Sequence, residues 1–417
     1  MYKIQPCKWS FTLLCGAMLL WSTPAQAKIS LELTQASYGA ISVQLHTAAD
    51  SVPSRQLQQA LAVARQDLST NKKIQIQAKQ QGEADYIVTV QAGKDQQVCV
   101  QVSSPYSQQQ SASIPKSCYK LTKTNHRRVG HSIADKVYTM VLGKPSVFLK
   151  KIVYVAETAN NKSKSYALTW SDYDGANAQV ILRSPEPIMS PSFSPDGSQV
   201  AYVSFEHKKA EIYVQNLHKA TRYVLSAEPG VNAAPCWSPD GKKIAYVLSI
   251  TGMTKIYVYD FRSKQRTIIA PGVSIDTEPF WNKDAKSILF ASNRSGSVQI
   301  HRYDLNNGQV TQLTHQGSYN VSPSLGESES TLVYLTRLEH KLQVVSLQLD
   351  TGVLSWIGSG TFDDTPKIDT HSGVVLYSKG VGEQRNLAMV STDGAMRTGI
   401  QLQGSAKHPA WVPDQAA

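Results

Sequence analysis

The chain has few cysteines, little charge and no apolar run long enough to cross a membrane. Five Cys in 417 residues are too few for a fold held together by disulfides. Charged residues make up 18% and apolar residues 41%, which excludes a disordered chain. Gly (25) and Pro (19) are near average usage, so collagen-like and low-complexity sequences are excluded as well. Tyr (19) outnumbers Phe (8), and Val and Ile are frequent, which favours β structure.

The first 27 residues have the three parts of a secretory signal peptide. Lys3 and Lys8 precede an apolar run, 11–21, and an Ala-x-Ala end follows at 25–27. The run is much shorter than the ~20 apolar residues that span a bilayer. We expect cleavage after Ala27 and a mature chain that is exported and does not span a membrane. Without Lys3 and Lys8 the net charge falls from +11 to +9, and export argues against a nucleic-acid partner.

Three cysteines remain after cleavage. Cys99 and Cys118 lie in two β-like segments, each on the side opposite the apolar residues, and a Ser/Gln-rich stretch joins them. In an oxidising compartment this pattern predicts a hairpin with a Cys99–Cys118 disulfide; two free surface thiols are the alternative. Cys236 has no obvious partner, and we expect a buried structural thiol.

Residues 28–150 predict an α/β domain with two helices and a mixed sheet. Apolar residues alternate with polar ones in 29–33 and 41–45, which predicts strands. A stripe from Leu57 to Leu68 predicts one helix. A second helix ends at Gly143, with Pro145 just beyond. The domain has no glycine-rich phosphate loop and no metal-ligand spacing.

Each of two groups of charged residues has two interpretations. For the basic cluster that precedes the second helix, we expect a solvated helix entrance; the alternative is a contact with an anion or a partner. For the acidic residues beside the repeated prolines, we expect solvated loops; the alternative is a cation site. The basic residues are His126, Arg127, Arg128 and His131; the acidic ones are Asp276, Glu278, Asp363 and Asp364.

Residues 151–417 contain a repeat. A Pro recurs at 191, 235, 279, 323 and 366, at spacings of 44, 44, 44 and 43, and an aromatic residue follows each by 11. Two copies carry a Ser-Pro-Asp-Gly tight turn between the Pro and the aromatic residue. A period near 44 is typical of a four-stranded β-propeller blade.

The two ends of the repeat region complete one further unit. An apolar triplet at 152–154 has no preceding Pro segment, and a Pro segment at 409–414 has no following triplet. Joined, they give a sixth blade in which the last strand pairs with the first blade and closes the ring. The sequence thus predicts an all-β six-bladed propeller.

The residues just before each Pro are expected in loops that open on one face of the propeller. They form a mixed small and polar ring that suits a protein or peptide ligand. The ring comprises Met189, Ser190, Ala233, Ala234, Thr277, Glu278, Ser322, Thr365 and His408. We find no Gly-x-Ser-x-Gly, His-Glu-x-x-His or Cys-x-x-Cys motif, and we expect no catalytic residue, metal or cofactor.

Several blocks resemble the TolB family, the periplasmic propeller proteins of the Tol-Pal system in Gram-negative bacteria. They are Ser-Asp-Tyr-Asp-Gly at 171–175, Arg-Ser-Pro at 183–185, Met-Ser-Pro at 189–191, Asp-Thr-Glu-Pro at 276–279 and Ser-Thr-Asp-Gly at 391–394. The resemblance covers the whole mature chain.

The resemblance implies a monomeric, non-enzymatic periplasmic adaptor that supports outer-membrane integrity and envelope invagination at division. It implies that the propeller face binds the lipoprotein Pal, with Ala234 and Thr277 at family interface positions and Val231 where the family can carry His. Other outer-membrane proteins and group A colicins are further implied partners. TolA would bind the first mature residues: Lys28, Ile29, Ser30, Leu31, Glu32 and Leu33. A carbohydrate-binding or peptidoglycan-binding propeller and a periplasmic hydrolase remain as alternatives.

Overall fold

The computed structural model describes residues 39–48, 54–78, 83–93, 95–105, 116–160, 163–381 and 384–414. The predicted signal peptide, the strand at 29–33 and the TolA segment, 28–33, lie outside these ranges. Residues 40–417 form one compact unit, and the descriptions that follow concern that unit. Within the described ranges, no helix combines the length and apolarity needed to cross a membrane.

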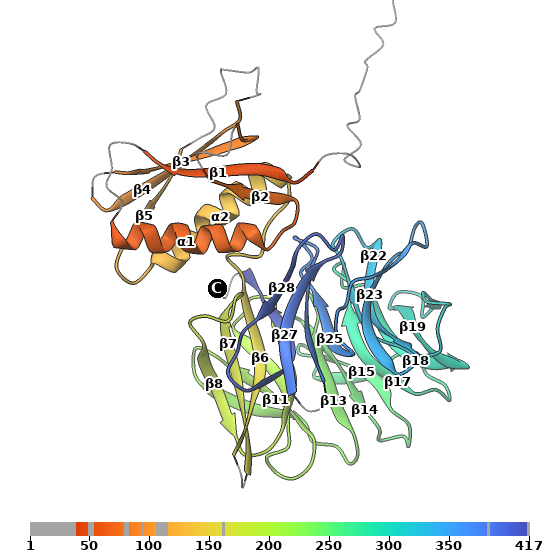
Figure 1. Cartoon of the computed structure of the whole chain (residues 1–417). Coiled ribbons are helices and arrows are strands. Elements are labelled where there is room, and N and C mark those ends of the chain that lie inside the picture. Colours follow the sequence, from red (N-terminus) through yellow and green to blue (C-terminus); the bar gives the residue numbers. More distant parts are fainter. Residues whose placement is uncertain are drawn as a thin grey trace, which may run out of the picture. The chain divides into compact units, whose positions relative to one another are not determined.

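The N-terminal part contains a mixed five-stranded sheet in the order β2-β1-β3-β4-β5 (Figure 1). Strand β1 pairs in parallel with β2 and β3, whereas β3, β4 and β5 pair antiparallel. This confirms the predicted mixed sheet. The strands are β1 (Ile41–Thr47), β2 (Ile74–Gln77), β3 (Tyr86–Ala92), β4 (Gln97–Ser103) and β5 (Ser117–Lys120).

Two helices, α1 (Arg55–Ser69) and α2 (His126–Leu142), lie side by side against this sheet (Figure 1). The Ser54 hydroxyl accepts a hydrogen bond from the Leu57 N–H (3.2 Å), which caps the start of α1. Gly143 ends α2 with φ 64°, the left-handed conformation that glycine adopts without steric cost. Both predicted helices are therefore confirmed.

A disulfide joins Cys99 on β4 to Cys118 on the edge strand β5, at directly paired positions. The two cysteines are 19 residues apart in sequence, so the bond closes this hairpin at the edge of the sheet. Cys236 is a free thiol.

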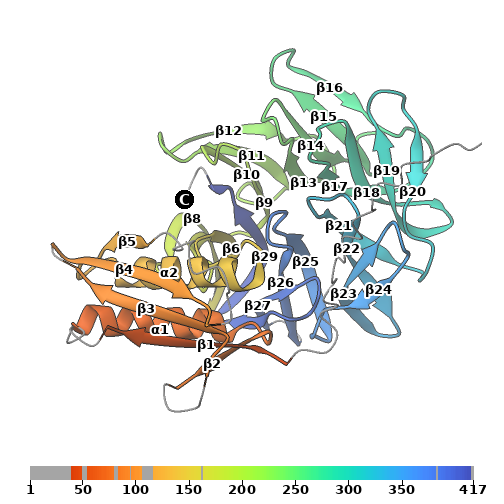
Figure 2. The same cartoon turned by 90° about the horizontal axis from the view of Figure 1, so that it is seen from above.

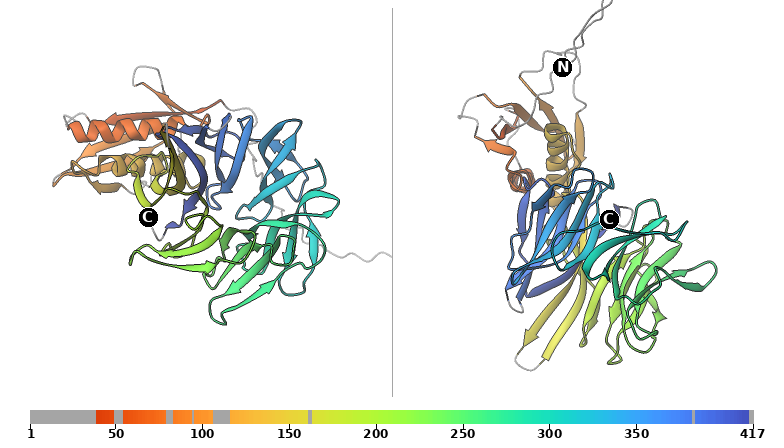
Figure 3. Two further views of the ribbon diagram at one scale, coloured as in Figure 1. Left: turned by 90° about the horizontal axis from the view of Figure 1, so that it is seen from below. Right: turned by 90° about the vertical axis from the view of Figure 1, so that its right-hand side faces the viewer.

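The rest of the described chain forms six groups of four strands arranged in a ring, and we call each group a sheet (Figures 2 and 3). One parallel pair, Leu342 with Phe362, joins the fifth and sixth groups into a single eight-stranded sheet. The first sheet contains β29 (Ser405–Val412), β6 (Lys151–Asn160), β7 (Ser163–Asp172) and β8 (Gln179–Ser184). The second runs from β9 (Ile188–Phe193) through β10 (Gln199–Ser204) and β11 (Glu211–Asn216) to β12 (Thr221–Ser226).

The remaining sheets repeat this order. The third is β13 (Asn232–Trp237), β14 (Lys243–Leu248), β15 (Lys255–Asp260) and β16 (Gln265–Ile268). The fourth is β17 (Asp276–Trp281), β18 (Ser287–Ser295), β19 (Ser297–Asp304) and β20 (Val310–Gln312). The fifth is β21 (Asn320–Leu325), β22 (Thr331–Leu338), β23 (Lys341–Gln348) and β24 (Leu354–Trp356). The sixth is β25 (Phe362–Ile368), β26 (Val374–Val381), β27 (Gln384–Ser391) and β28 (Arg397–Ile400).

The ring closes through the C-terminal strand, as the sequence predicts. Strand β29 pairs antiparallel with β6, and Trp411 stands opposite Ile152. Each repeated aromatic residue lies in the second strand of its sheet, and all are buried: Tyr202, Tyr246, Phe290, Tyr334 and Tyr377. These side chains fill the space between neighbouring sheets, which explains their strict register with the prolines.

The N-terminal part and the propeller share one hydrophobic cluster. It includes Leu57 of α1, Ile133 of α2, Tyr173 after β7, and Val374 and Met389 of the sixth sheet. The packing is continuous across the predicted domain boundary at residue 150, so that boundary stays a prediction.

Candidate functional site

The residue before each repeated Pro has a left-handed backbone, with φ between 45° and 54°. All six lie at a register shift within the innermost strand of a sheet, so they belong to β-bulges. The prediction that they lie in loops is therefore wrong. They are Ser190, Ala234, Glu278, Ser322, Thr365 and His408.

The following Pro does not explain this geometry, because its ring favours an extended conformation of the preceding residue. The left-handed conformation costs on the order of 1–3 kcal/mol for a residue other than glycine, and it persists because the surrounding sheet holds it. Six identical bulges bring six side chains to the axis of the ring.

These side chains line a cavity of about 250 Å³ along the axis of the propeller. Six of the nine predicted ring residues are among its walls: Ser190, Ala234, Glu278, Ser322, Thr365 and His408. The other three, Met189, Ala233 and Thr277, each precede a bulge and stand opposite the second strand. Of the nine residues predicted from the sequence to ring the channel, six line the cavity and three lie beside it on the inner strands.

The cavity contains charged and polar groups beside its prolines. Ser322 donates two hydrogen bonds to the Glu278 carboxylate, from its N–H (2.7 Å) and its hydroxyl (2.9 Å). Burial raises the pKa of the Glu278 carboxyl above its usual value, and burial lowers the pKa of His408. Thr365 Oγ1 and His408 Nδ1 are buried and have no hydrogen-bond partner among the described residues. They are groups that a bound ligand can satisfy.

Sequence reasoning missed Lys367 and the aromatic residues Phe193, Phe280 and Trp411, which also line the cavity. The signal for Lys367 was present, because the position after each repeated Pro is small or apolar in the other copies. For the three aromatic residues, only the closed ring shows that they reach the axis.

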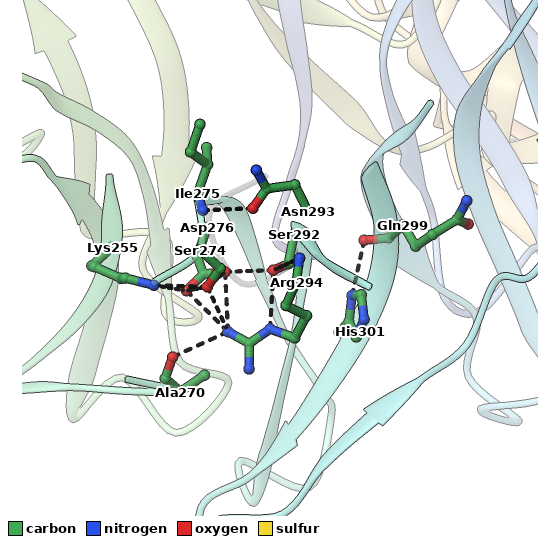
Figure 4. Close-up of polar contacts among 10 residues, drawn as sticks. All are labelled: Lys255, Ala270, Ser274, Ile275, Asp276, Ser292, Asn293, Arg294, Gln299 and His301. Atoms are coloured by element: carbon green, nitrogen blue, oxygen red, sulfur yellow. Dashed lines mark hydrogen bonds and ion pairs between the residues drawn. The ribbon is translucent and has the colours of Figure 1, made fainter. Parts of the chain in front are cut away.

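A buried carboxylate, Asp276, supports the bulge that contains Glu278. It is fully buried and lies 2.9 Å from Lys255 Nζ and 3.0 Å from Arg294 Nη2 (Figure 4). Ser292 donates a further hydrogen bond of 2.6 Å to Asp276. The expectation of solvated acidic loops is therefore wrong for Asp276, whose oxygens are held by partners from the neighbouring strands.

The same position, three residues before the Pro, is buried and polar in three other repeats. The Asn232 amide contacts Glu228 and Ser226, and the Asn320 amide contacts Gln299 and Gln316. The Asp363 carboxylate accepts hydrogen bonds from the N–H groups of Val344 (3.2 Å) and Gly360 (2.9 Å). These side chains fix the segments that lead into the inner strands, so the cavity is built on a rigid frame.

Exposed apolar side chains gather at the end of the propeller where the inner strands begin. Of the fourteen large apolar residues that are exposed within the described ranges, eight lie at the starts of inner strands or in turns between second and third strands. They are Met189, Val231, Ile250, Met253, Val273, Ile275, Leu338 and Phe362. Val273 is 94% exposed. We call these eight residues the apolar rim.

The predicted basic cluster lies within the first two turns of α2, and it does not form a solvated helix entrance throughout. His131 is only 3% exposed and its Nδ1 lies 2.7 Å from Asp67 Oδ2. Arg127 is ion-paired with Asp174 after β7. The partners of His131 and Arg127 are therefore carboxylates of the same chain.

The cavity offers binding groups and a poor nucleophile. Cys236 lines it, but burial raises the pKa of this thiol, which keeps it protonated.

Comparisons with known proteins agree with this architecture. A family model described as the TolB beta propeller domain matches residues 138–415. The Tol-Pal system protein TolB of Methylococcus capsulatus is 42% identical over 106 residues, a quarter of each chain.

Solved structures cover more of the chain. The crystal structure of TolB from Acinetobacter baumannii matches with a TM-score of 0.78 and 27% identity, over 90% of this chain and 98% of that one. A putative TolB from Agrobacterium tumefaciens matches with a TM-score of 0.51 and 17% identity, over 64% and 96%, and shows the fold alone. With the family model covering well over half of its length, the chain belongs to the TolB β-propeller family.

Proposed function

We propose that this chain is a non-enzymatic periplasmic adaptor of a Tol-Pal system, which binds the lipoprotein Pal at the propeller face and TolA through residues 28–33. In this role it links the layers of the envelope and supports outer-membrane integrity and invagination at division. Family membership supports the system. The observation that carries the proposed Pal face is the apolar rim at the end of the propeller where the inner strands begin, the end from which these strands lead into the cavity lined by six bulge residues.

The rim and the cavity suit a folded protein partner with a protruding segment. The apolar rim residues lose their exposure to water on contact with a partner, and each Å² of apolar surface removed from water contributes ~25 cal/mol to the favourable free energy. The polar groups inside the cavity can orient the inserted segment, since Thr365 Oγ1 and His408 Nδ1 have unused hydrogen-bonding capacity among the described residues. A flat, fully polar face would offer neither contribution.

Titration calorimetry with the soluble domain of Pal tests the face. Met189→Arg places a charge in the apolar rim at a position that is already exposed, and we expect at least tenfold weaker binding. Gln309→Arg is the matched control, because Gln309 lies in the exposed turn between β19 and β20, at the opposite ends of the strands. Equal affinity of Met189→Arg and the unsubstituted chain would refute this face.

The TolA contact needs a separate experiment. A chain that begins at residue 34 should lose TolA binding and keep Pal binding. If it still binds TolA with full affinity, the segment 28–33 is not the binding site, while the Pal result stands on its own.

The aromatic cavity walls support a second candidate, a carbohydrate ligand such as a peptidoglycan fragment. Phe193, Phe280 and Trp411 line the cavity, and aromatic faces commonly pack against sugar rings. Titration with soluble peptidoglycan fragments distinguishes the two functions. If the chain binds these fragments saturably and Phe280→Ala abolishes the binding, the carbohydrate ligand is favoured. If the chain does not bind them, the protein partner is favoured.

A further inference from the structure

A second polar site lies away from the cavity, where α1 and α2 meet the turn after β7. Its centre is His131 of α2, whose imidazole is 3% exposed. Asp172 and Asp174 extend from the turn toward it, and the ligand atoms of the three residues lie within 4.8 Å of one another. These positions are far apart in the sequence, which explains why metal-ligand spacing gave no signal.

One nitrogen of His131 is oriented by a buried carboxylate. Its Nδ1 lies 2.7 Å from Asp67 Oδ2, and the Tyr173 hydroxyl donates to the other oxygen of Asp67 (2.6 Å). Since Asp67 accepts from both neighbours, it favours the tautomer in which Nδ1 carries the proton. In a neutral imidazole with this tautomer, Nε2 carries a lone pair. A carboxylate–histidine pair of this kind orients metal-binding imidazoles in proteins.

The other nitrogen, Nε2, is buried and has no hydrogen-bond partner within the described ranges. It points to Asp174, with 3.7 Å between Nε2 and Oδ2. A lone pair and a carboxylate at this separation gain nothing from each other unless a cation lies between them. The distance is slightly longer than the separation of two ligands that share one zinc ion.

The charges around the site leave one negative charge unbalanced. Asp67, Asp172 and Asp174 contribute three carboxylates, against the Arg127 guanidinium on Asp174 and Lys151 Nζ, 3.5 Å from Asp172. With a neutral imidazole, a divalent cation is a natural counter-charge. Asp172 and Asp174 are one-fifth exposed, and a cavity of about 210 Å³ adjoins Asp174. Water can therefore complete the coordination.

We propose that His131, Asp172 and Asp174 form a binding site for a divalent transition-metal ion of the zinc class. One nitrogen and two carboxylate ligands fit zinc, whereas Ca²⁺ and Mg²⁺ prefer ligand sets made of oxygen alone. The bound ion would join α2 to the turn after β7, and so would stabilise the packing of the N-terminal part on the first sheet. This site is independent of partner binding at the propeller face.

The test is titration of the metal-free mature chain with Zn²⁺ by calorimetry, and with Co²⁺ followed by its visible absorption. We expect one ion per chain and a rise in the melting temperature with Zn²⁺ but not with Mg²⁺. His131→Gln should abolish binding, and Asp67→Asn should weaken it ten- to a hundredfold. His126→Gln, on the same helix but outside the site, should bind as the unsubstituted chain does.

Two results would overturn the proposal. Failure of the unsubstituted chain to bind Zn²⁺ would show that these three side chains are not a metal site. Equal binding by His131→Gln would mean that the ion sits elsewhere on the surface. If His131→Gln does not fold, Asp172→Asn decides instead, because this ligand is partly exposed: unchanged zinc binding contradicts the site, and its loss supports it.

Discussion

Ser322 and Glu278 occupy the same position in neighbouring repeats, and Ser322 donates two hydrogen bonds, of 2.7 and 2.9 Å, to the Glu278 carboxylate. Both residues have left-handed backbones at bulges of adjacent inner strands. The contact therefore joins two blades at the wall of the cavity. It also leaves an ionisable group in a place where burial raises its pKa.

The raised pKa of Glu278 predicts a stability that decreases as pH rises. Its ordinary value is 4.5, so above about pH 4.5 the unfolded chain releases this proton more readily than the folded chain does. Folding is thus disfavoured progressively up to the folded-state pKa. Glu278→Gln removes this dependence, and we expect its stability relative to the unsubstituted chain to increase between pH 4 and pH 8. Urea unfolding at both pH values measures it; a difference that does not change with pH would argue against the raised pKa.

Asp276 predicts a large loss of stability on substitution. Asp276→Ala leaves Lys255 and Arg294 without their carboxylate partner, and Lys255 is almost fully buried. Breaking a buried ion pair in this way costs roughly 3–5 kcal/mol. Asp350→Ala, in an exposed turn, is the control and should stay within about 0.5 kcal/mol. Denaturant unfolding of both variants makes the comparison, and similar small effects would show that Asp276 is not the anchor of its bulge.

The repeat made most of the propeller predictable from the sequence. The constant distance of 11 residues from Pro191 to Tyr202, and its recurrence, fixes the pairing of the first two strands in each sheet. The orphan segments at both ends fix the closure. Local patterns suffice here because each strand pairs chiefly with its neighbours in sequence.

Charged groups were the hardest to assign, since their partners are distant in sequence. His131 contacts Asp67, 64 residues away, and Arg127 contacts Asp174, 47 residues away. Neither separation follows from the periodicity of the sequence. Without known partners, such charged residues are expected to be exposed to solvent. Asp276 is different, because Asn232 and Asn320 hold the same repeat position, and comparing the copies position by position indicates a buried role.

The Cys99–Cys118 bond predicts a measurable stabilisation. Replacing both residues with Ser should lower the free energy of unfolding by about 3 kcal/mol for a loop of this size. Alkylation under denaturing, non-reducing conditions should label only Cys236 in the mature chain. Three labels per chain would contradict the disulfide.

The closing strand predicts that a short C-terminal deletion destabilises the ring. Removing 411–417 takes away the pairing of Trp411 and Val412 with β6 and the hydrogen bond from Trp411 Nε1 to the Lys367 carbonyl (2.9 Å). Loss of the buried Val412 side chain and of the partly buried Trp411 side chain costs roughly 2–5 kcal/mol, so the melting temperature should fall by several degrees. A chain that ends at Asp414 keeps these contacts and serves as control; equal melting of the two chains would contradict closure.

Asp393 predicts an acid-sensitive connection between the N-terminal part and the sixth blade. It lies 2.8 Å from Lys73, next to the backbone contact from Lys72 N–H to the Ala395 carbonyl (2.9 Å). Burial alone would raise its pKa, but the hydrogen bonds from Lys73 and Ser391 outweigh burial and lower the pKa to about 2. The ordinary value is 3.8, so the stabilisation is complete above about pH 4 and is lost as the pH falls toward 2. Both side chains are partly exposed, which limits the effect to about 1 kcal/mol.

Asp393→Asn should unfold with a smaller dependence on pH between 4 and 2, while Asp350→Asn should follow the unsubstituted chain. Identical acid unfolding curves for all three chains would show that this ion pair does not stabilise the fold.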